Sequence, residues 1–224
     1  LAQASVVSLY DSTRYQNPKK SGKDSDWKTV DAEIVAKLNE LKNSGSKVAI
    51  VSSTIISPST NALVFEFLSK YPNAYHVTHD AMSYSGLIEA TEKSFGSKNL
   101  PVYKFGNADV ILSIGADFAA SWLNPVEYAK DYSTRRKVSK ENTNMSQHIH
   151  VESVPSPTSA TADMKYVVSA SDEMKFIAEL YSALTTGSSS SIKGVNEVKD
   201  ALLAAKSSGK MCLVVNGNND TNAQ

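Results

Sequence analysis

The sequence predicts an α/β protein, with an open, doubly wound, mostly parallel sheet and helices on both faces. Short apolar runs alternate with amphipathic stretches along its 224 residues. The run at 47–53 is apolar up to its closing serines, which is typical of a strand that is buried on both faces, and the run at 108–117 is the clearest strand in the sequence. A helical stretch stands between most successive runs, in the order expected of parallel crossover units.

The predicted strands are short and bounded by polar or turn-forming residues. Within the run QHIHVES, His148 and His150 are two residues apart, so both side chains are expected on one face of the strand. The strands are expected at 5–10, 47–53, 74–77, 108–117, 147–153, 164–168 and 211–217.

The predicted helices carry recognisable start and stop residues. In the first, at 27–45, apolar residues four, four and three apart share one face, Asp26 precedes the helix and Gly45 ends it. In the second, at 57–72, Ser57 is the expected N-cap and Pro58 the first helical residue. Further helices are expected at 86–96, 124–133, 169–187 and 195–209.

The composition excludes several classes of protein. Lys plus Arg and Asp plus Glu both number 23, and this balance disfavours a nucleic-acid partner, which calls for a basic excess. Apolar runs such as 110–112 are far shorter than the roughly 20 residues that cross a bilayer, so no direct membrane span is expected. The single cysteine, Cys212, permits no intrachain disulfide and cannot hold an iron–sulfur cluster, which takes about four thiolates.

The tract at 185–191, TTGSSSS, has the composition of a flexible linker. We therefore expect an α/β domain at 1–185, a linker at 186–191, and the start of a second α/β unit at 192–224. That last segment holds only one helix and one strand, and the chain begins with Leu1 rather than Met. The expectation is a fragment of a longer protein.

Ligands of open parallel sheets bind beyond the carboxyl ends of the strands. A glycine there lets backbone N–H groups approach a phosphate, and an acidic residue can accept hydrogen bonds from a ribose or a guanine. The sequence has no GxGxxG, GxxxxGK[ST] or GxSxG motif, so no catalytic residue is assigned. The predicted cofactor-binding residues are Ser53, Thr54, Gly115, Ala116 and Asp117.

The stretch YHVTHDAMSYSG, at 75–86, raises the question of a metal site. His76, His79 and Asp80 have side chains that suit zinc or iron. A complete site takes three or four ligands in a fixed geometry, and the sequence offers no certain further ligand. The favoured interpretation is satisfied loop histidines, with no metal bound.

The segment ADVILSIGADFAASWLNPVEYAK, at 108–130, resembles a segment of the molybdopterin oxidoreductases, the family of dimethyl-sulfoxide reductase and formate dehydrogenase. In that family the strand and its Gly-Ala-Asn turn lie beside a pterin guanine dinucleotide. The segments 47–74 and 148–184 extend the resemblance, which covers most of 25–215. It implies the α/β domain of that family.

A closer resemblance is to the large iron–sulfur subunits of alternative complex III, on the segments 51–60, 79–96, 115–133 and 145–153. These belong to bacterial, membrane-bound quinol oxidoreductases. The resemblance implies a cofactor-free scaffold domain in a periplasmic electron-transfer complex, with iron–sulfur clusters elsewhere in the full chain. The implied partners are the rest of its own chain and other subunits, through which it would associate with the membrane.

Two departures from the family leave alternatives open. Active members carry a metal ligand shortly before a Gly-Leu pair, and aligning Gly86-Leu87 places that position near His79 and Asp80, where no cysteine stands. If the domain is active, the candidate ligands are His79, Asp80 and Ser83, and the protein is a molybdenum or tungsten bis-pterin oxidoreductase. Asp117 stands where the family has Asn, and its charge would repel a pyrophosphate. A guanine-nucleotide module built on the Gly115 loop is the third possibility.

Overall fold

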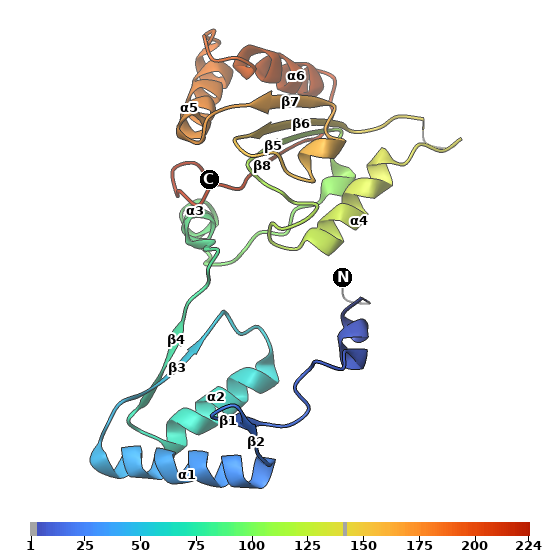
Figure 1. The fold of residues 1–224 in the computed structure, drawn as a ribbon. Coiled ribbons are helices and arrows are strands. Elements are labelled where there is room, and N and C mark those ends of the chain that lie inside the picture. Colours follow the sequence, from blue (N-terminus) through green and yellow to red (C-terminus); the bar gives the residue numbers. More distant parts are fainter. Residues whose placement is uncertain (1–3, 141–142) are drawn as a thin grey trace. The chain divides into compact units, whose positions relative to one another are not determined.

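The computed structural model describes residues 4–140 and 143–224 (Figure 1). Its contacts divide the chain into two units, Leu1–Met82 and Ser83–Gln224, and each is described by itself. The α/β class is confirmed, because parallel strands alternate with helices in both units. The long strands are divided between two parallel sheets instead of forming the single sheet that the sequence suggested.

The first unit contains a two-stranded parallel sheet and two helices. A short antiparallel hairpin precedes them, and its turn residues Ser21 and Gly22 have φ values of 49° and 78°, as a type I′ turn requires. The elements are β1 (Lys19–Lys20), β2 (Lys23–Asp24), α1 (Trp27–Ser44), β3 (Val48–Ser52), α2 (Pro58–Lys70) and β4 (Ala74–Thr78).

The predicted boundaries of these two helices are confirmed. The Asp26 side chain accepts a hydrogen bond from Thr29 N at 2.9 Å, which satisfies one of the free N–H groups at the start of α1. Gly45 ends the helix with a φ of 69°, a conformation that glycine adopts without steric cost. Ser57 caps α2 through Thr60 N at 3.3 Å.

The prediction of a strand at 5–10 was wrong. Residues Ala4–Tyr10 form a 3₁₀ helix, η1, in which no residue is buried. An isolated strand leaves its backbone groups without partners, whereas a 3₁₀ turn forms its hydrogen bonds locally. The run SVVSLY is apolar in composition, but Val6, Val7 and Leu9 remain exposed.

The second unit is a four-stranded parallel sheet in the order β7-β6-β5-β8. Its strands are β5 (Val110–Ile114), β6 (Gln147–Glu152), β7 (Met164–Val167) and β8 (Cys212–Asn216). The connecting elements are α3 (Ser85–Phe95), η2 (Phe105–Asn107), α4 (Pro125–Arg136), η3 (Ser159–Thr161), α5 (Ala170–Thr186) and α6 (Val195–Ser207). Helix α5 begins at the cap Ser169.

Helices cover both faces of this sheet, as the sequence predicted. On one face, α5 and α6 pack against the strands, with Phe176 and Val198 completely buried beside Leu112. On the other face, Ile111 packs in a cluster with aromatic residues from η2, the 115–124 loop and α4. Figure 1 shows α5 and α6 together on one side of the strands and α4 on the other.

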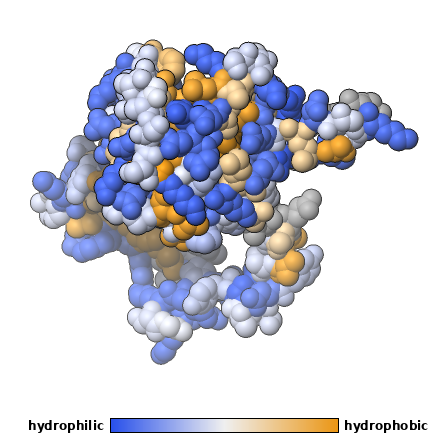
Figure 2. Space-filling view, turned by 90° about the horizontal axis from the view of Figure 1, so that it is seen from above, coloured by the Kyte–Doolittle hydropathy of each residue, from blue (hydrophilic) through white to orange (hydrophobic). Residues whose placement is uncertain are grey.

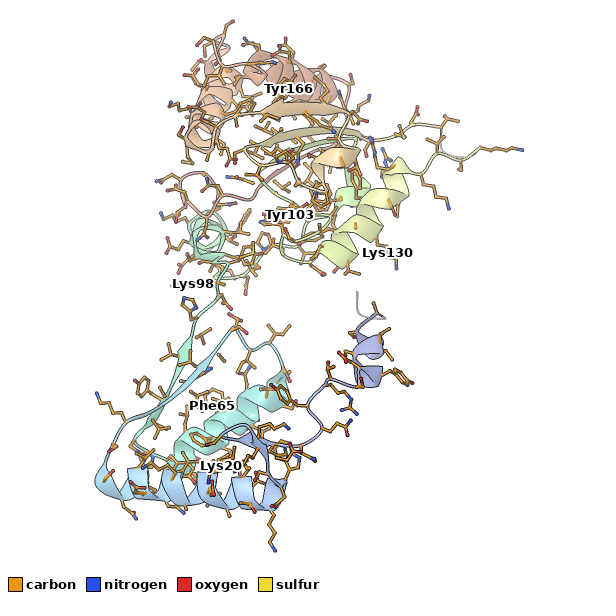
Figure 3. All side chains as sticks on the ribbon, in the orientation of Figure 1. Lys20, Phe65, Lys98, Tyr103, Lys130 and Tyr166 are labelled. Atoms are coloured by element: carbon orange, nitrogen blue, oxygen red, sulfur yellow. The ribbon has the colours of Figure 1, made fainter. Side chains whose placement is uncertain are left out.

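The aromatic cluster contains one tyrosine with a strongly altered acidity. The Tyr103 ring lies 5.3 Å from that of Trp122 and 6.4 Å from that of Phe105, in the region labelled in Figure 3. Burial raises the pKa of Tyr103 to about 12. Its hydroxyl therefore stays protonated, and the ring serves as a packing residue.

The division of the chain differs from the predicted one. Strand β8 pairs with β5 and forms one edge of the second sheet, and Val195 and Val198 of α6 are completely buried in its core. The segment 186–191 leads from the end of α5 towards α6 within this unit, and Ser190 and Asn196 exchange hydrogen bonds of 3.0 and 2.8 Å. Residues 192–224 therefore complete the sheet that begins at 110.

Seen from the side of α5 and α6, the surface is largely hydrophilic, with smaller hydrophobic patches between the polar side chains (Figure 2). This pattern agrees with helices whose apolar faces point into the sheet. No helix in the described residues is long and apolar enough to cross a bilayer.

Candidate functional site

The strand order of the second sheet defines where a ligand would bind. From β5 the chain moves to β6 and β7 on one side and then returns to β8 on the other. In open parallel sheets the crevice lies where the strand order reverses, beyond the carboxyl ends of the strands. Here that point lies between β5, followed by Gly115, and β8, followed by Gly217.

Gly115 and Gly217 bring the two loops into direct backbone contact. A Cβ atom on Gly217 would lie 2.2 Å from the carbonyl oxygen of Gly115, a distance that no side chain tolerates. Gly115 itself has a φ of 58°, in the left-handed region that favours glycine. The contact depends on glycine at both positions.

A cleft of about 390 Å³ opens at this point, within the usual size range of small-ligand pockets. Three carboxylates line it, those of Asp117, Glu152 and Glu173, and its described lining contains no lysine or arginine. The cleft is therefore acidic.

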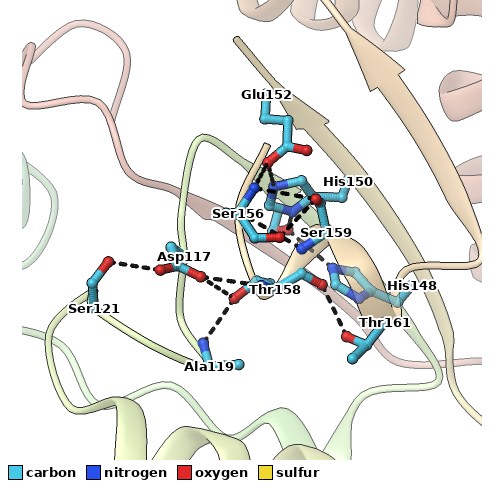
Figure 4. Close-up of polar contacts among 11 residues, drawn as sticks. Asp117, Ala119, Ser121, His148, His150, Glu152, Ser156, Thr158, Ser159 and Thr161 are labelled. Atoms are coloured by element: carbon cyan, nitrogen blue, oxygen red, sulfur yellow. Dashed lines mark hydrogen bonds and ion pairs between the residues drawn. The ribbon is translucent and has the colours of Figure 1, made fainter. Parts of the chain in front are cut away.

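The carboxylate of Asp117 is already bonded to the protein. Its Oδ1 accepts hydrogen bonds from Thr158 N at 3.2 Å and Thr158 Oγ1 at 2.6 Å, and its Oδ2 accepts one from Ser121 Oγ at 2.7 Å. Thr158 Oγ1 accepts in turn from Ala119 N at 2.9 Å. These bonds tie the loop after β5 to the loop after β6 (Figure 4).

Glu152, the last residue of β6, forms the inner wall of the cleft. It is 4% exposed, and its Oε2 accepts hydrogen bonds from Ser156 N at 3.0 Å and from His150 Nε2 at 3.1 Å. Burial lowers the pKa of His150, although the Glu152 carboxylate acts in the opposite direction. A neutral imidazole thus donates to a buried carboxylate.

Behind Glu152, a row of polar side chains continues along β6. The hydroxyl of Ser113 lies within hydrogen-bonding reach of both His148 Nε2, at 3.0 Å, and His150 Nδ1. The other ring nitrogen of His148 lies 3.1 Å from the Tyr132 hydroxyl. Burial, with a smaller effect of His150, lowers the pKa of His148 to about 3.

The five predicted cofactor-binding residues do not form one described site. Gly115 and Asp117 line the cleft, while Ala116 is completely buried beside it. Ser53 and Thr54 belong to the first unit. There Thr54 bonds both carboxylate oxygens of Asp80, through its N–H at 2.8 Å and through its hydroxyl.

Three of the metal candidates have other side-chain or backbone partners, and for His79 the described bond is that of its backbone N–H to Ser52 O, at 2.8 Å. The Thr54 hydrogen bonds hold the pKa of Asp80 below its ordinary value, and His76 Nε2 lies 2.8 Å from Ser52 Oγ. Ser83, in the second unit, accepts a hydrogen bond from Ser85 N at 3.2 Å near the start of α3. Within the described part of the chain, no group of three or more His, Cys, Asp or Glu side chains is arranged to hold a metal ion.

Sequence reasoning missed three residues of the cleft region: Glu152, Thr158 and Glu173. Glu152 lies at the carboxyl end of a predicted strand. The rule that ligands bind beyond such strand ends identified Asp117 and could have identified Glu152 as well. No sequence signal marks Thr158 or Glu173. The path of the loop after β6 brings Thr158 to the cleft region, and the position of α5 brings Glu173 there.

We also compared the chain with known proteins. No family model matches it, and no curated protein matches it significantly. Its function therefore has to be inferred from its residues and their arrangement.

The cleft does not fit the pyrophosphate of a pterin guanine dinucleotide. Two unit charges of the same sign 4 Å apart repel by about 4 kcal/mol at an effective dielectric constant of 20, and three carboxylates face this space. The groups that bind phosphate in such crevices are free N–H donors and basic side chains. Here the N–H groups of Ala119 and Thr158 are already bonded to side chains of the chain itself.

Proposed function

We propose that this chain is a cofactor-free scaffold domain, related to the molybdopterin oxidoreductases, in the large iron–sulfur subunit of a membrane-associated quinol oxidoreductase. It would support the electron-transfer complex by shape and contact, while clusters elsewhere in the full chain carry the electrons. The family assignment rests on the sequence resemblance of 47–74, 108–130 and 148–184.

One observation carries the cofactor-free part of this proposal. The hydrogen bonds between Asp117 and Thr158, here called the Asp117–Thr158 latch, join two loops beside an acidic cleft. Thr158 N and Oγ1 both donate to Asp117, so the loops beyond β5 and β6 bind each other where related enzymes bind a dinucleotide. The strand-end loops can change in this way without altering the architecture of the fold, because the sheet is held by separate cores on its two faces.

The first unit gives independent support. In active relatives a residue near the position of His79 and Asp80 binds the metal. Here both Asp80 oxygens accept hydrogen bonds from Thr54, which leaves the carboxylate engaged in a link between two loops. The competing proposal, a molybdenum or tungsten enzyme, would require this link to open.

The deciding experiment measures metal and pterin in the longest natural protein that carries this sequence, purified from its native membranes. Elemental analysis should find iron but less than about 0.1 molybdenum or tungsten per chain, and oxidative pterin fluorescence should be absent. One molybdenum or tungsten per chain, with pterin, would reject the scaffold proposal in favour of the enzyme.

A second measurement separates the scaffold from a nucleotide-binding module. GDP and GTP at millimolar concentration should not raise the melting temperature of the 224-residue chain, because a ligand that binds the native state would stabilise it. The comparison is a triple variant with Asp117→Asn, Glu152→Gln and Glu173→Gln, which removes the three negative charges of the cleft. Its melting temperature is measured with and without the same nucleotides. Stabilisation of the wild type would favour the nucleotide module.

A further inference from the structure

A continuous row of hydrogen-bonding side chains runs through the interior of the second unit. It passes from Glu152 Oε2 to His150 at 3.1 Å, then through Ser113 to His148 at 3.0 Å, and on to Tyr132 Oη at 3.1 Å. The remaining link, between Ser113 Oγ and His150 Nδ1, is a close hydrogen bond. Figure 4 shows Glu152, His150 and His148 in this order along β6.

The sequence builds this row through the period of the strands. His148, His150 and Glu152 alternate along β6, so all three side chains project from one face. In the parallel register, Ser113 of β5 is paired with His150, which places its hydroxyl between the two imidazoles. Tyr132 of α4, the helix that covers this face, supplies the last hydroxyl.

The middle of the row is closed to solvent, and its two end residues, Glu152 at 4% and Tyr132 at 7% exposed, each lie beside a more open region. Ser113 and His148 are 0% exposed and His150 is 1% exposed. At one end, Glu152 lines the acidic cleft. At the other end, Tyr132 Oη lies 3.3 Å from the carbonyl oxygen and 3.4 Å from the hydroxyl of Thr161, an exposed residue.

The charged groups around the row leave both imidazoles neutral. Asp117 and Glu152 favour the protonated form of His150 and Lys165 opposes it, but burial outweighs them. For His148, burial, His150 and Arg136 lower the pKa and Asp163 raises it. A neutral imidazole has one donor and one acceptor nitrogen, as a proton relay requires.

We propose that Tyr132, His148, Ser113, His150 and Glu152 form a proton relay that connects solvent at Thr161 with the strand-end cleft. The row would deliver protons to Glu152, or withdraw them, without a charged intermediate resting in the core. This role is independent of the proposed scaffold function, because it depends only on residues of the second unit.

Each transfer moves one hydrogen by one bond. The Nε2 proton of His150 passes to the Glu152 carboxylate, and the Ser113 hydroxyl proton passes to His150 Nδ1. The Nε2 proton of His148 then replaces the proton on Ser113 Oγ.

The remaining steps restore the outer end. The Tyr132 hydroxyl proton passes to His148 Nδ1, and a solvent proton at the Thr161 end replaces the proton on Tyr132. The net change is one proton removed from solvent and one bound to Glu152. Both imidazoles end neutral, in the opposite tautomer.

Two members of the row have a choice of partner that a fixed network lacks. Ser113 has one hydroxyl proton and two neighbouring imidazole nitrogens, so it satisfies either direction of the row. Tyr132 has one proton for His148 Nδ1 or for the Thr161 carbonyl. Both orders of hydrogen bonds are thus complete, which is the condition for transfer in either direction.

Hydrogen exchange of the histidine ring N–H groups tests the relay in the 224-residue chain labelled with ¹⁵N-histidine. In the wild type, we expect the His150 ring N–H to exchange at least about tenfold faster than the buried backbone amide of Ile149, which exchanges by opening of the sheet. Ser113→Ala should slow the ring exchange at least about tenfold and leave the Ile149 amide unchanged. Ser113→Thr, which keeps a hydroxyl, should restore the rate.

Tyr132→Phe gives a second test that does not alter the strands, and it should also slow exchange at both histidines. If Ser113→Ala fails to fold, the exchange rates of the wild type and of Tyr132→Phe are sufficient to test the relay. Equal exchange of the His150 ring and the Ile149 amide in the wild type would overturn the relay and leave a static polar network. Unchanged ring exchange in a folded Ser113→Ala or Tyr132→Phe variant would overturn it as well.

Discussion

Asp117 and Thr158 hold together two loops at the mouth of the second sheet. One carboxylate oxygen of Asp117 accepts both the N–H and the hydroxyl of Thr158, at 3.2 and 2.6 Å. The two residues are 41 positions apart and follow different strands. Their pairing shapes the acidic cleft and occupies the place where a dinucleotide would need free donors.

Removing either partner of this latch should destabilise the second unit. We expect Asp117→Ala and Thr158→Val each to lower the free energy of unfolding by about 1–3 kcal/mol, because a part-buried polar group loses its partner. Urea denaturation measures the loss. Ser133→Ala is the matched control, since that hydroxyl bonds only a carbonyl within its own helix at an exposed position, and it should cost less than about 0.5 kcal/mol.

The double variant tests whether the two residues act together. The losses of Asp117→Ala and Thr158→Val should not add, and the double variant should cost less than their sum by at least about 0.5 kcal/mol. Strict additivity would mean that the hydrogen bonds between them contribute nothing to stability.

Gly217→Ala should destabilise the chain through a steric clash. The new methyl group would lie 2.2 Å from the Gly115 carbonyl oxygen, and relieving this contact should cost about 1–3 kcal/mol. Gly209→Ala is the comparison, because Gly209 has a φ of 69° and no neighbour within 4 Å. Its cost, about 1 kcal/mol, is conformational only. Thermal unfolding of a Gly217→Ala protein as stable as the wild type would show that the two loops do not touch.

Much of the fold could be predicted from the sequence, because it depends on local periodicity. The alternation in 147–152, the helical spacing of 30–41 and the caps Asp26 and Ser57 each act within a few residues, and the structure confirms them. The strand predicted at 5–10 was wrong because a strand needs a neighbouring strand to pair with, and no local pattern shows whether one is present. The break between the units and the pairing of β8 with β5 are likewise long-range features.

The site was predictable only in part, for the same reason. Gly115 and Asp117 follow a strand directly, so the strand-end rule identified them. Thr158 reaches Asp117 because the loop after β6 crosses back, and Ser113 meets the two histidines only in the parallel register of β5 and β6. Neither contact has a signature in the sequence around the residues that form it.

The integration of α6 into the second sheet leads to a comparison of two adjacent leucines. Leu202 is 7% exposed in the core, whereas Leu203 is 42% exposed. We expect Leu202→Ala to lower the free energy of unfolding by about 2–5 kcal/mol and Leu203→Ala by less than about 1 kcal/mol. Denaturant titration measures both. Equal, small losses would indicate that 192–224 is a separate unit after all.

Stability should depend on pH through His148. Its pKa in the folded protein is about 3, below the ordinary value of 6.5, so the unfolded chain takes up this proton first as the pH falls. The stabilisation is complete above pH 6.5 and is lost progressively towards pH 3, at about 1.4 kcal/mol per pH unit for one proton. His148→Gln should have a slope lower by about one proton between pH 6 and pH 4 in urea titrations. Identical slopes would mean that His148 is not buried as a neutral ring.

The link between Thr54 and Asp80 can be tested by titrating Asp80. The Thr54 side chain is the main cause of the lowered Asp80 pKa, and the Thr54 backbone N–H is the next. Thr54→Val removes the hydroxyl but keeps the N–H, so the pKa should rise part of the way towards its ordinary value. Carbon-13 NMR of the carboxyl group measures the shift, with Ser53→Ala as the neighbouring control that should leave it unchanged. An unaltered pKa in Thr54→Val would mean that the carboxylate is not held by Thr54, and would return Asp80 to the candidate metal ligands.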